Sequence, residues 1–135
     1  MRDLKYLFAY TIPVSAYLSF MSFGAGTYAA VIYAFVIIPF LDAFLGQDHK
    51  NLEQEEIKEK KINRVFDWML YINLPIVFGL LFLVFNKVQS FEYTTTEMIG
   101  LSMSAGILLA TNGINVAHEL CHRNKYYEKF IGKAL

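Results

Sequence analysis

The chain has 135 residues and no formal net charge, and 56% of its residues are apolar against 18% charged. Soluble domains have roughly 45–50% apolar and about 25% charged residues, so this composition excludes an ordinary soluble domain. Twelve basic residues balance twelve acidic ones, which leaves no electrostatic basis for binding nucleic acid. Twelve Phe, nine Tyr and one Trp are typical of helices that face lipid or the membrane interface.

Four apolar stretches occur in chain order, at residues 6–23, 27–45, 68–85 and 98–117. Each is near the length of about 20 residues that a helix needs to cross a bilayer. We expect each to be helical, because lipid offers no partner to an unpaired backbone amide. The first stretch is the weakest, since it contains Pro13 and three serines. The sequence therefore predicts an all-α integral membrane protein with four transmembrane helices.

Two short segments set how these helices are joined. Gly24-Ala25-Gly26 predicts a tight turn, which makes the first two spans an antiparallel hairpin. Thr94, with Thr-Thr-Glu directly after it, predicts the N-cap of the fourth helix.

Lys and Arg are distributed unevenly between the connections. They occur at the N-terminus, five times in residues 46–67, and four times after residue 122. The 24–26 turn has none, and the connection after the third span has only Lys87. Because cytoplasmic segments are rich in Lys and Arg, this pattern predicts four crossings with both termini in the cytoplasm.

Residues 118–122, His-Glu-Leu-Cys-His, come directly after the fourth span. Two histidines four apart lie on one helix face, so His118 and His122 can bind a single metal ion. Thr111 and Asn115 fall on the same predicted face, and Asn115 could orient an imidazole ring. Glu119 stands where zinc proteases keep a general base. Neutral imidazole suits zinc, copper and iron, so the pair alone does not identify the metal.

Two ligands do not complete a metal site, and the chain has one other histidine, His49. We expect His49 to be solvated, because it lies beside Asp48 in a charged connection. The bare motif fits two classes of protein. A zinc protease would take a third His or Glu ligand from further along the chain, whereas a membrane di-iron oxygenase would use several more histidine clusters.

Residues 112–123 read Asn-Gly-Ile-Asn-Val-Ala-His-Glu-Leu-Cys-His-Arg. This segment resembles the first histidine box of the membrane-bound alkane hydroxylases (alkane 1-monooxygenases). Residues 39–48, closing the second span, are similar to the family's Leu-Asp-x-x-x-Gly-x-Asp stretch, and residues 126–130 resemble the family's sequence just past the box. Asp42 and Asp48 are therefore candidates for positions near the site, although each could simply cap a helix end or begin a loop.

Two residues of the box differ from the family's usual pattern. Cys121 stands where small residues such as Gly are familiar, and Arg123 stands where Lys is usual. Neither change removes a ligand. We expect Cys121 to be a small buried residue that points away from the histidine face.

The resemblance implies terminal hydroxylation of n-alkanes with dioxygen at a di-iron centre, with His118 and His122 as iron ligands. It also implies electrons from a rubredoxin-type donor and its reductase, in the bacterial inner membrane. The other ligands are not among these residues, so we expect residues 1–135 to be the N-terminal part of a six-helix bundle, inactive alone. A zinc metalloprotease and a related membrane desaturase or hydroxylase remain alternatives.

Overall fold

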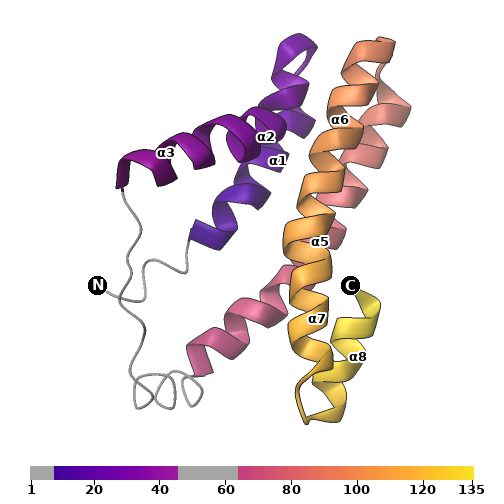
Figure 1. The fold of residues 1–135 in the computed structure, drawn as a ribbon. Coiled ribbons are helices and arrows are strands. Elements are labelled where there is room, and N and C mark those ends of the chain that lie inside the picture. Colours follow the sequence, from indigo (N-terminus) through magenta and orange to yellow (C-terminus); the bar gives the residue numbers. More distant parts are fainter. Residues whose placement is uncertain (1–7, 46–63) are drawn as a thin grey trace.

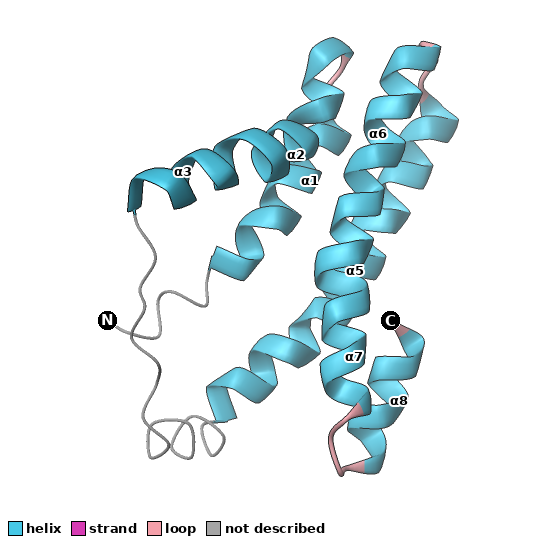
Figure 2. Cartoon of the chain, viewed as in Figure 1, coloured by secondary structure: helices cyan, strands magenta, loops and turns pink. Residues whose placement is uncertain are grey.

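The computed structural model describes residues 8–45 and 64–135, and nearly all of these are helical (Figure 2). No strand occurs within these two ranges, which confirms the predicted all-α fold. The regular helices are α1 (Thr11–Met21), α2 (Ala29–Ile32), α3 (Ile38–Leu45), α5 (Arg64–Ser90), α6 (Thr95–Leu108), α7 (Asn115–Cys121) and α8 (Tyr126–Ala134). A 3-10 turn, η2 (Gly24–Tyr28), and two π-helical segments, η3 (Tyr33–Ile37) and η4 (Leu109–Ile114), join several of them.

Within the part of the chain that the structure describes, three helical segments are long and apolar enough to cross a membrane: Gly24–Phe44, Asp67–Ser90 and Thr95–Cys121. They correspond to the second, third and fourth predicted spans, as in a multi-pass membrane protein. The first predicted span is a shorter apolar helix, Phe8–Met21. Its regular part, α1, has 11 residues. A helix of that length rises only about 17 Å at 1.5 Å per residue, less than the hydrocarbon core of about 30 Å.

The N-terminal hairpin packs on α6 through small side chains. Ser104 Oγ of α6 lies within hydrogen-bond distance of two acceptors in the hairpin, Ser19 Oγ at 3.1 Å and the Thr27 carbonyl at 2.9 Å, which share its single proton. A Cβ atom at Gly100 would lie 2.7 Å from the Tyr28 ring. Small residues let helix backbones approach closely in membranes, so this contact brings α1, η2 and α6 together in one core.

The start of α6 is fixed by a capping box. The Thr94 hydroxyl accepts a hydrogen bond from the Glu97 N–H, at 3.3 Å, and the Glu97 carboxylate accepts one from the Thr94 N–H, at 2.8 Å. The same carboxylate accepts the Gly24 N–H at 2.6 Å. Gly24 has a φ of 59°, a conformation that glycine adopts without steric cost. The predicted turn and N-cap are both confirmed, and they contact one another.

All three of the long helical segments are irregular, and a proline accompanies the irregularity in two of them. The π-helical segment η3 precedes Pro39, which has no N–H with which to continue the α-helical ladder. Pro75 lies inside α5. In Figure 1 the first turns of α5 diverge from α6, while its later turns run beside α6. The second π-helical segment, η4, lies directly before α7 and has no proline to explain it.

Candidate metal centre

His118 lies in α7 and His122 is the residue that caps its C-terminus. Their Nε2 atoms are 3.2 Å apart, their ring centroids are 4.4 Å apart, and both residues are exposed. Two nitrogens bound to one metal at about 2.1 Å, at an angle of roughly 90–110°, lie about 3.0–3.4 Å from each other. The separation of the two nitrogens therefore suits two neighbouring coordination positions of a single ion, and it equally suits a hydrogen bond between the two neutral rings.

Among residues 8–45 and 64–135, the structure brings no further metal ligand to this pair. Within the described ranges, no group of three or more His, Cys, Asp or Glu side chains is placed to hold a metal ion. Asp42 is exposed on α3, which extends away from α7 in Figure 1. Asp48 and His49 lie outside the described residues. Within the described residues, the histidine pair is thus an incomplete metal site.

A pocket of about 470 Å³ lies between α7, η4, α5 and the residues around the start of α1. Asn115, Glu119 and Arg123 line it from α7 and the residues after it. They are spaced at steps of four, so they share a helix face. The two histidines are not among the lining residues. The single polar face predicted from Thr111 to His122 is therefore divided, because Thr111 and Asn115 face the pocket and the histidines lie on the exposed side.

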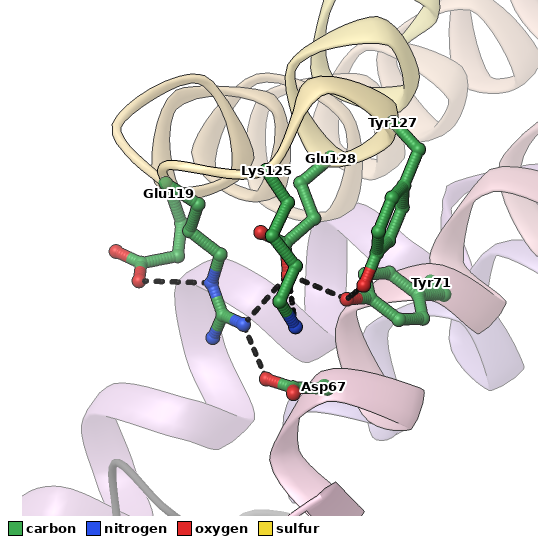
Figure 3. Close-up of polar contacts among 7 residues, drawn as sticks. Asp67, Tyr71, Glu119, Lys125, Tyr127 and Glu128 are labelled. Carbon is green, nitrogen blue, oxygen red and sulfur yellow. Dashed lines mark hydrogen bonds and ion pairs between the residues drawn. The ribbon is translucent and has the colours of Figure 1, made fainter.

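Glu119 makes its polar contact with Arg123 and not with the histidines. Its Oε1 atom lies 3.8 Å from Arg123 Nε, and Figure 3 shows its carboxylate on that side of the helix. Exposed ion pairs of this kind contribute about 1 kcal/mol or less. The contact alone therefore does not hold Glu119 in one position, and its part in a metal site stays a prediction.

Arg123, one residue after the histidine pair, joins three helices. Its Nη1 atom forms an ion pair with Asp67 of α5 and lies 3.2 Å from Glu128 Oε1 of α8. Glu128 is only 2% exposed and also accepts a hydrogen bond of 2.5 Å from the Tyr71 hydroxyl. Figure 3 shows Asp67, Tyr71 and Glu128 converging from α5 and α8. We call Arg123, Asp67, Glu128 and Tyr71 the Arg123 cluster.

The cluster keeps its buried carboxylate ionised. Burial on its own would raise the pKa of Glu128, but the Tyr71 hydrogen bond and the charges of Arg123 and Lys125 hold that pKa below its ordinary value. Burial would likewise lower the pKa of Arg123, whereas its hydrogen bonds to Asp67 and Glu128 raise it. The charges therefore support one another, and loss of Arg123 would leave the buried Glu128 carboxylate with only the more distant Lys125 as a cationic partner, at 3.8 Å.

A second polar contact joins η4 to α5, on the N-terminal side of the histidine helix. Asn112 Nδ2 donates to Asn73 Oδ1 at 2.8 Å and lies 3.3 Å from the Ala9 carbonyl. Asn112 is 4% exposed and Asn73 is 5% exposed. The sequence alone predicted neither this contact nor the Arg123 cluster. An Asn inside an apolar stretch indicates a buried polar contact, because an unpaired amide is costly in a membrane-spanning helix. The sequence does not show which residue is its partner.

The expectation that Cys121 is buried was wrong, because the residue is exposed. Helix α8 covers this side of α7 with Gly132, and a Cβ atom there would lie 2.9 Å from the Cys121 sulfur. A glycine brings the two helices close but has no side chain to enclose the sulfur. The sulfur lies beside α8.

Comparisons with known proteins place this chain near one group of enzymes. Alkane 1-monooxygenase of Pseudomonas putida is 25% identical over 114 aligned positions, which cover 82% of this chain and 28% of that protein. Alkane 1-monooxygenase 2 of Pseudomonas aeruginosa is 27% identical, with 83% and 30% covered. Alkane 1-monooxygenase 2 of Alcanivorax borkumensis is 28% identical, with 100% and 37% covered.

No family model matches the chain, and no solved structure matches it. The chain spans 28% to 37% of the length of the three relatives named above. Their similarity confirms the resemblance to the alkane 1-monooxygenases that the histidine box predicted.

Proposed function

We propose that this chain carries the first histidine pair of a membrane-bound alkane monooxygenase, an oxidoreductase that hydroxylates n-alkanes at the terminal carbon with dioxygen. The names of the relatives support the reaction class, and the 3.2 Å between the two Nε2 atoms supports a shared metal ion. The comparisons do not favour a zinc protease, because the relatives named are monooxygenases.

The two histidines have the central role in this proposal. His118 and His122 would hold iron through their Nε2 atoms, and a bound di-iron centre would supply the activation of dioxygen. We propose that the remaining ligands come from histidines outside these 135 residues, in keeping with the greater length of the relatives. The chain alone would then be inactive. Asn115 and Glu119 line the pocket and not the histidine face, so for Asn115 to orient a histidine ring its side chain would have to turn toward the pair when the site is completed.

The location of the pair suits such a reaction. The long apolar helices lie in the bilayer, where n-alkanes dissolve, and the histidines lie at the end of the segment Thr95–Cys121. We propose that this end faces the cytoplasm of a bacterium, with the protein in the inner membrane and both termini cytoplasmic, as the Lys and Arg distribution predicts. A rubredoxin-type electron donor, reduced by its reductase, could then approach the centre from the cytoplasm.

Substitution of either histidine in the complete enzyme tests the proposal. His118→Ala and His122→Ala should each abolish alkane oxidation and lower the iron bound per protein, because each removes one ligand. Lys129→Gln, at an exposed position of α8, is the control and should retain both alkane oxidation and bound iron. Undiminished iron and turnover in either histidine variant would refute the assignment.

The origin of the missing ligands has a separate test. Sequencing the gene beyond the codon for Leu135 should show an in-frame continuation with further apolar spans and several histidine-rich clusters. An authentic stop codon at that point would count against the proposal.

A further inference from the structure

The two histidines stand at the end of a helix, where a metal site is hardest to keep in shape. The last turn of a helix frays readily, and His122 is itself the C-cap of α7. Metal ligands must stay within about 0.5 Å of their working positions. Something outside the helix must therefore hold this end of α7 if the pair is to bind one ion.

Arg123 is the charged residue next to that end, and its side chain is tied on two sides. It forms an ion pair with Asp67 of α5 and another, at 3.2 Å, with Glu128 of α8. Its side chain is 25% exposed, so solvent weakens these contacts less than it would on an open surface. Both carboxylates are contacted by the same nitrogen, Nη1, whose two N–H groups are fixed in the plane of the guanidinium, whereas the donors of a lysine ammonium rotate freely.

The partners of Arg123 are themselves fixed. Glu128 is 2% exposed and accepts the Tyr71 hydroxyl at 2.5 Å, so its carboxylate has little freedom to move. Helix α8 lies so close to α7 that a Cβ atom at Gly132 would be 2.8 Å from the Ala117 carbonyl. Two neighbouring helices therefore hold the residue directly after His122.

We propose that Arg123 is a positioning residue for the histidine pair. By its contacts with Asp67 and Glu128, it holds the end of α7 and so sets the geometry in which the two Nε2 atoms face one metal ion. This inference rests on the proposed function, since it takes the pair to be metal ligands. The guanidinium itself does not touch the metal.

The full 135-residue chain in detergent micelles provides the first test, carrying His49→Ala and also Cys121→Ser, because the exposed Cys121 thiol would bind or reduce Cu²⁺. His118 and His122 are then its only histidines, and Cu²⁺ alone is the probe. Arg123→Gln should raise the Kd for Cu²⁺ about tenfold or more, the usual effect of losing a residue that orients metal ligands. It should also broaden the Cu²⁺ EPR lines, because the ligand geometry becomes heterogeneous. Arg123→Lys should restore only part of the affinity.

Lys129→Gln is the matched control and should bind Cu²⁺ as the parent does. Circular dichroism on each sample gives the folded fraction, to which every Kd is referred. If Arg123→Gln binds Cu²⁺ as tightly as the control and with the same EPR line widths, the positioning role is overturned, whatever the variant's stability. If His118→Ala binds Cu²⁺ as the parent does, the ligand assignment itself fails, which is a different result.

The complete enzyme gives a second measurement that does not depend on the behaviour of the 135-residue chain. Asp67→Asn removes one contact of Arg123 and leaves Glu128 paired, so it disturbs the fold less than loss of the arginine. It should lower the iron bound per folded protein and change the optical or Mössbauer spectrum of the iron that remains. Iron content and spectra equal to those of Lys129→Gln would overturn the proposal.

Discussion

Asn112 and Asn73 join two helices by a direct side-chain hydrogen bond of 2.8 Å in the buried centre of the bundle. One amide lies in η4, just before the histidine helix, and the other lies in α5. Because lipid supplies no alternative partner, an amide that loses such a contact stays unsatisfied.

The Asn pair leads to the first prediction. Asn112→Leu should destabilise the protein by about 0.6 kcal/mol or more, because side-chain hydrogen bonds between membrane helices contribute about 0.6 kcal/mol on average and at most about 1.7 kcal/mol. Denaturant unfolding in micelles, monitored by circular dichroism, gives the free energy of unfolding. Asn86→Leu is the control, since the exposed Asn86 amide donates its hydrogen bond to the Phe82 carbonyl of its own helix and to no other helix among the described residues. Equal losses in the two variants would show that the contact between helices adds nothing.

The crossing of the N-terminal hairpin over α6 leads to the second prediction. Gly100→Ala places a Cβ atom 2.7 Å from the Tyr28 ring, so the helices must separate. We expect it to lower the free energy of unfolding by about 1–3 kcal/mol, as overpacked sites do. Gly106→Ala in the same helix meets nothing within 4 Å, and it should be neutral or slightly stabilising because alanine favours helices. Thermal melting of both variants in micelles tests this contrast, which fails if they melt alike.

The lowered pKa of Glu128 leads to a prediction of how the stability of the protein depends on pH. Its folded-state pKa lies below the ordinary value of 4.5, so the unfolded chain binds its proton first as the pH falls. The stabilisation is therefore complete above pH 4.5 and is lost as the pH drops through the lowered pKa of the folded state. Melting temperatures measured in micelles on both sides of pH 4.5 should fall on the acid side, and Glu128→Gln should make that fall shallower. An identical fall in wild type and variant would contradict the prediction.

The contact between α7 and α8 gives a prediction for the metal site. Gly132→Ala should push α8 away, because the new Cβ atom would be 2.8 Å from the Ala117 carbonyl and 2.9 Å from the Cys121 sulfur. In the complete enzyme we expect a loss of bound iron of the kind seen when residues around metal ligands are changed, on the order of tenfold in affinity. Gly79→Ala, which meets nothing within 4 Å, should retain iron. Equal iron content in both variants would show that the packing of α8 on α7 does not affect the metal site.

Local patterns predicted much of the fold from the sequence. The apolar run at 68–85 lies within α5, and Thr94 and Gly24 take the cap and turn conformations that their residue types favour. These features depend on neighbours within a few positions. The shortness of α1 also agrees with a local signal, since Pro13 and three serines marked that stretch as the weakest.

Contacts between distant segments could not be predicted in this way. The histidine box drew attention to residues 118–122, but the partners of Arg123 come from α5, 56 positions earlier, and from α8. Nothing local to Glu128 distinguishes a buried carboxylate from a solvated one on a short charged helix. Cys121 was misjudged for the same reason, since its exposure depends on which residue of α8 faces it.

The π-helical segment η4 (Leu109–Ile114) lies between α6, which packs on the N-terminal hairpin, and α7, which carries the histidines. Each residue of a regular helix advances the next by about 100°, so the faces of α6 and α7 would otherwise be locked in register. The wider turn breaks that register. Helix α6 therefore buries Gly100 and Ser104, while the face of α7 that carries the imidazoles is not fixed by the register of α6 and lies exposed.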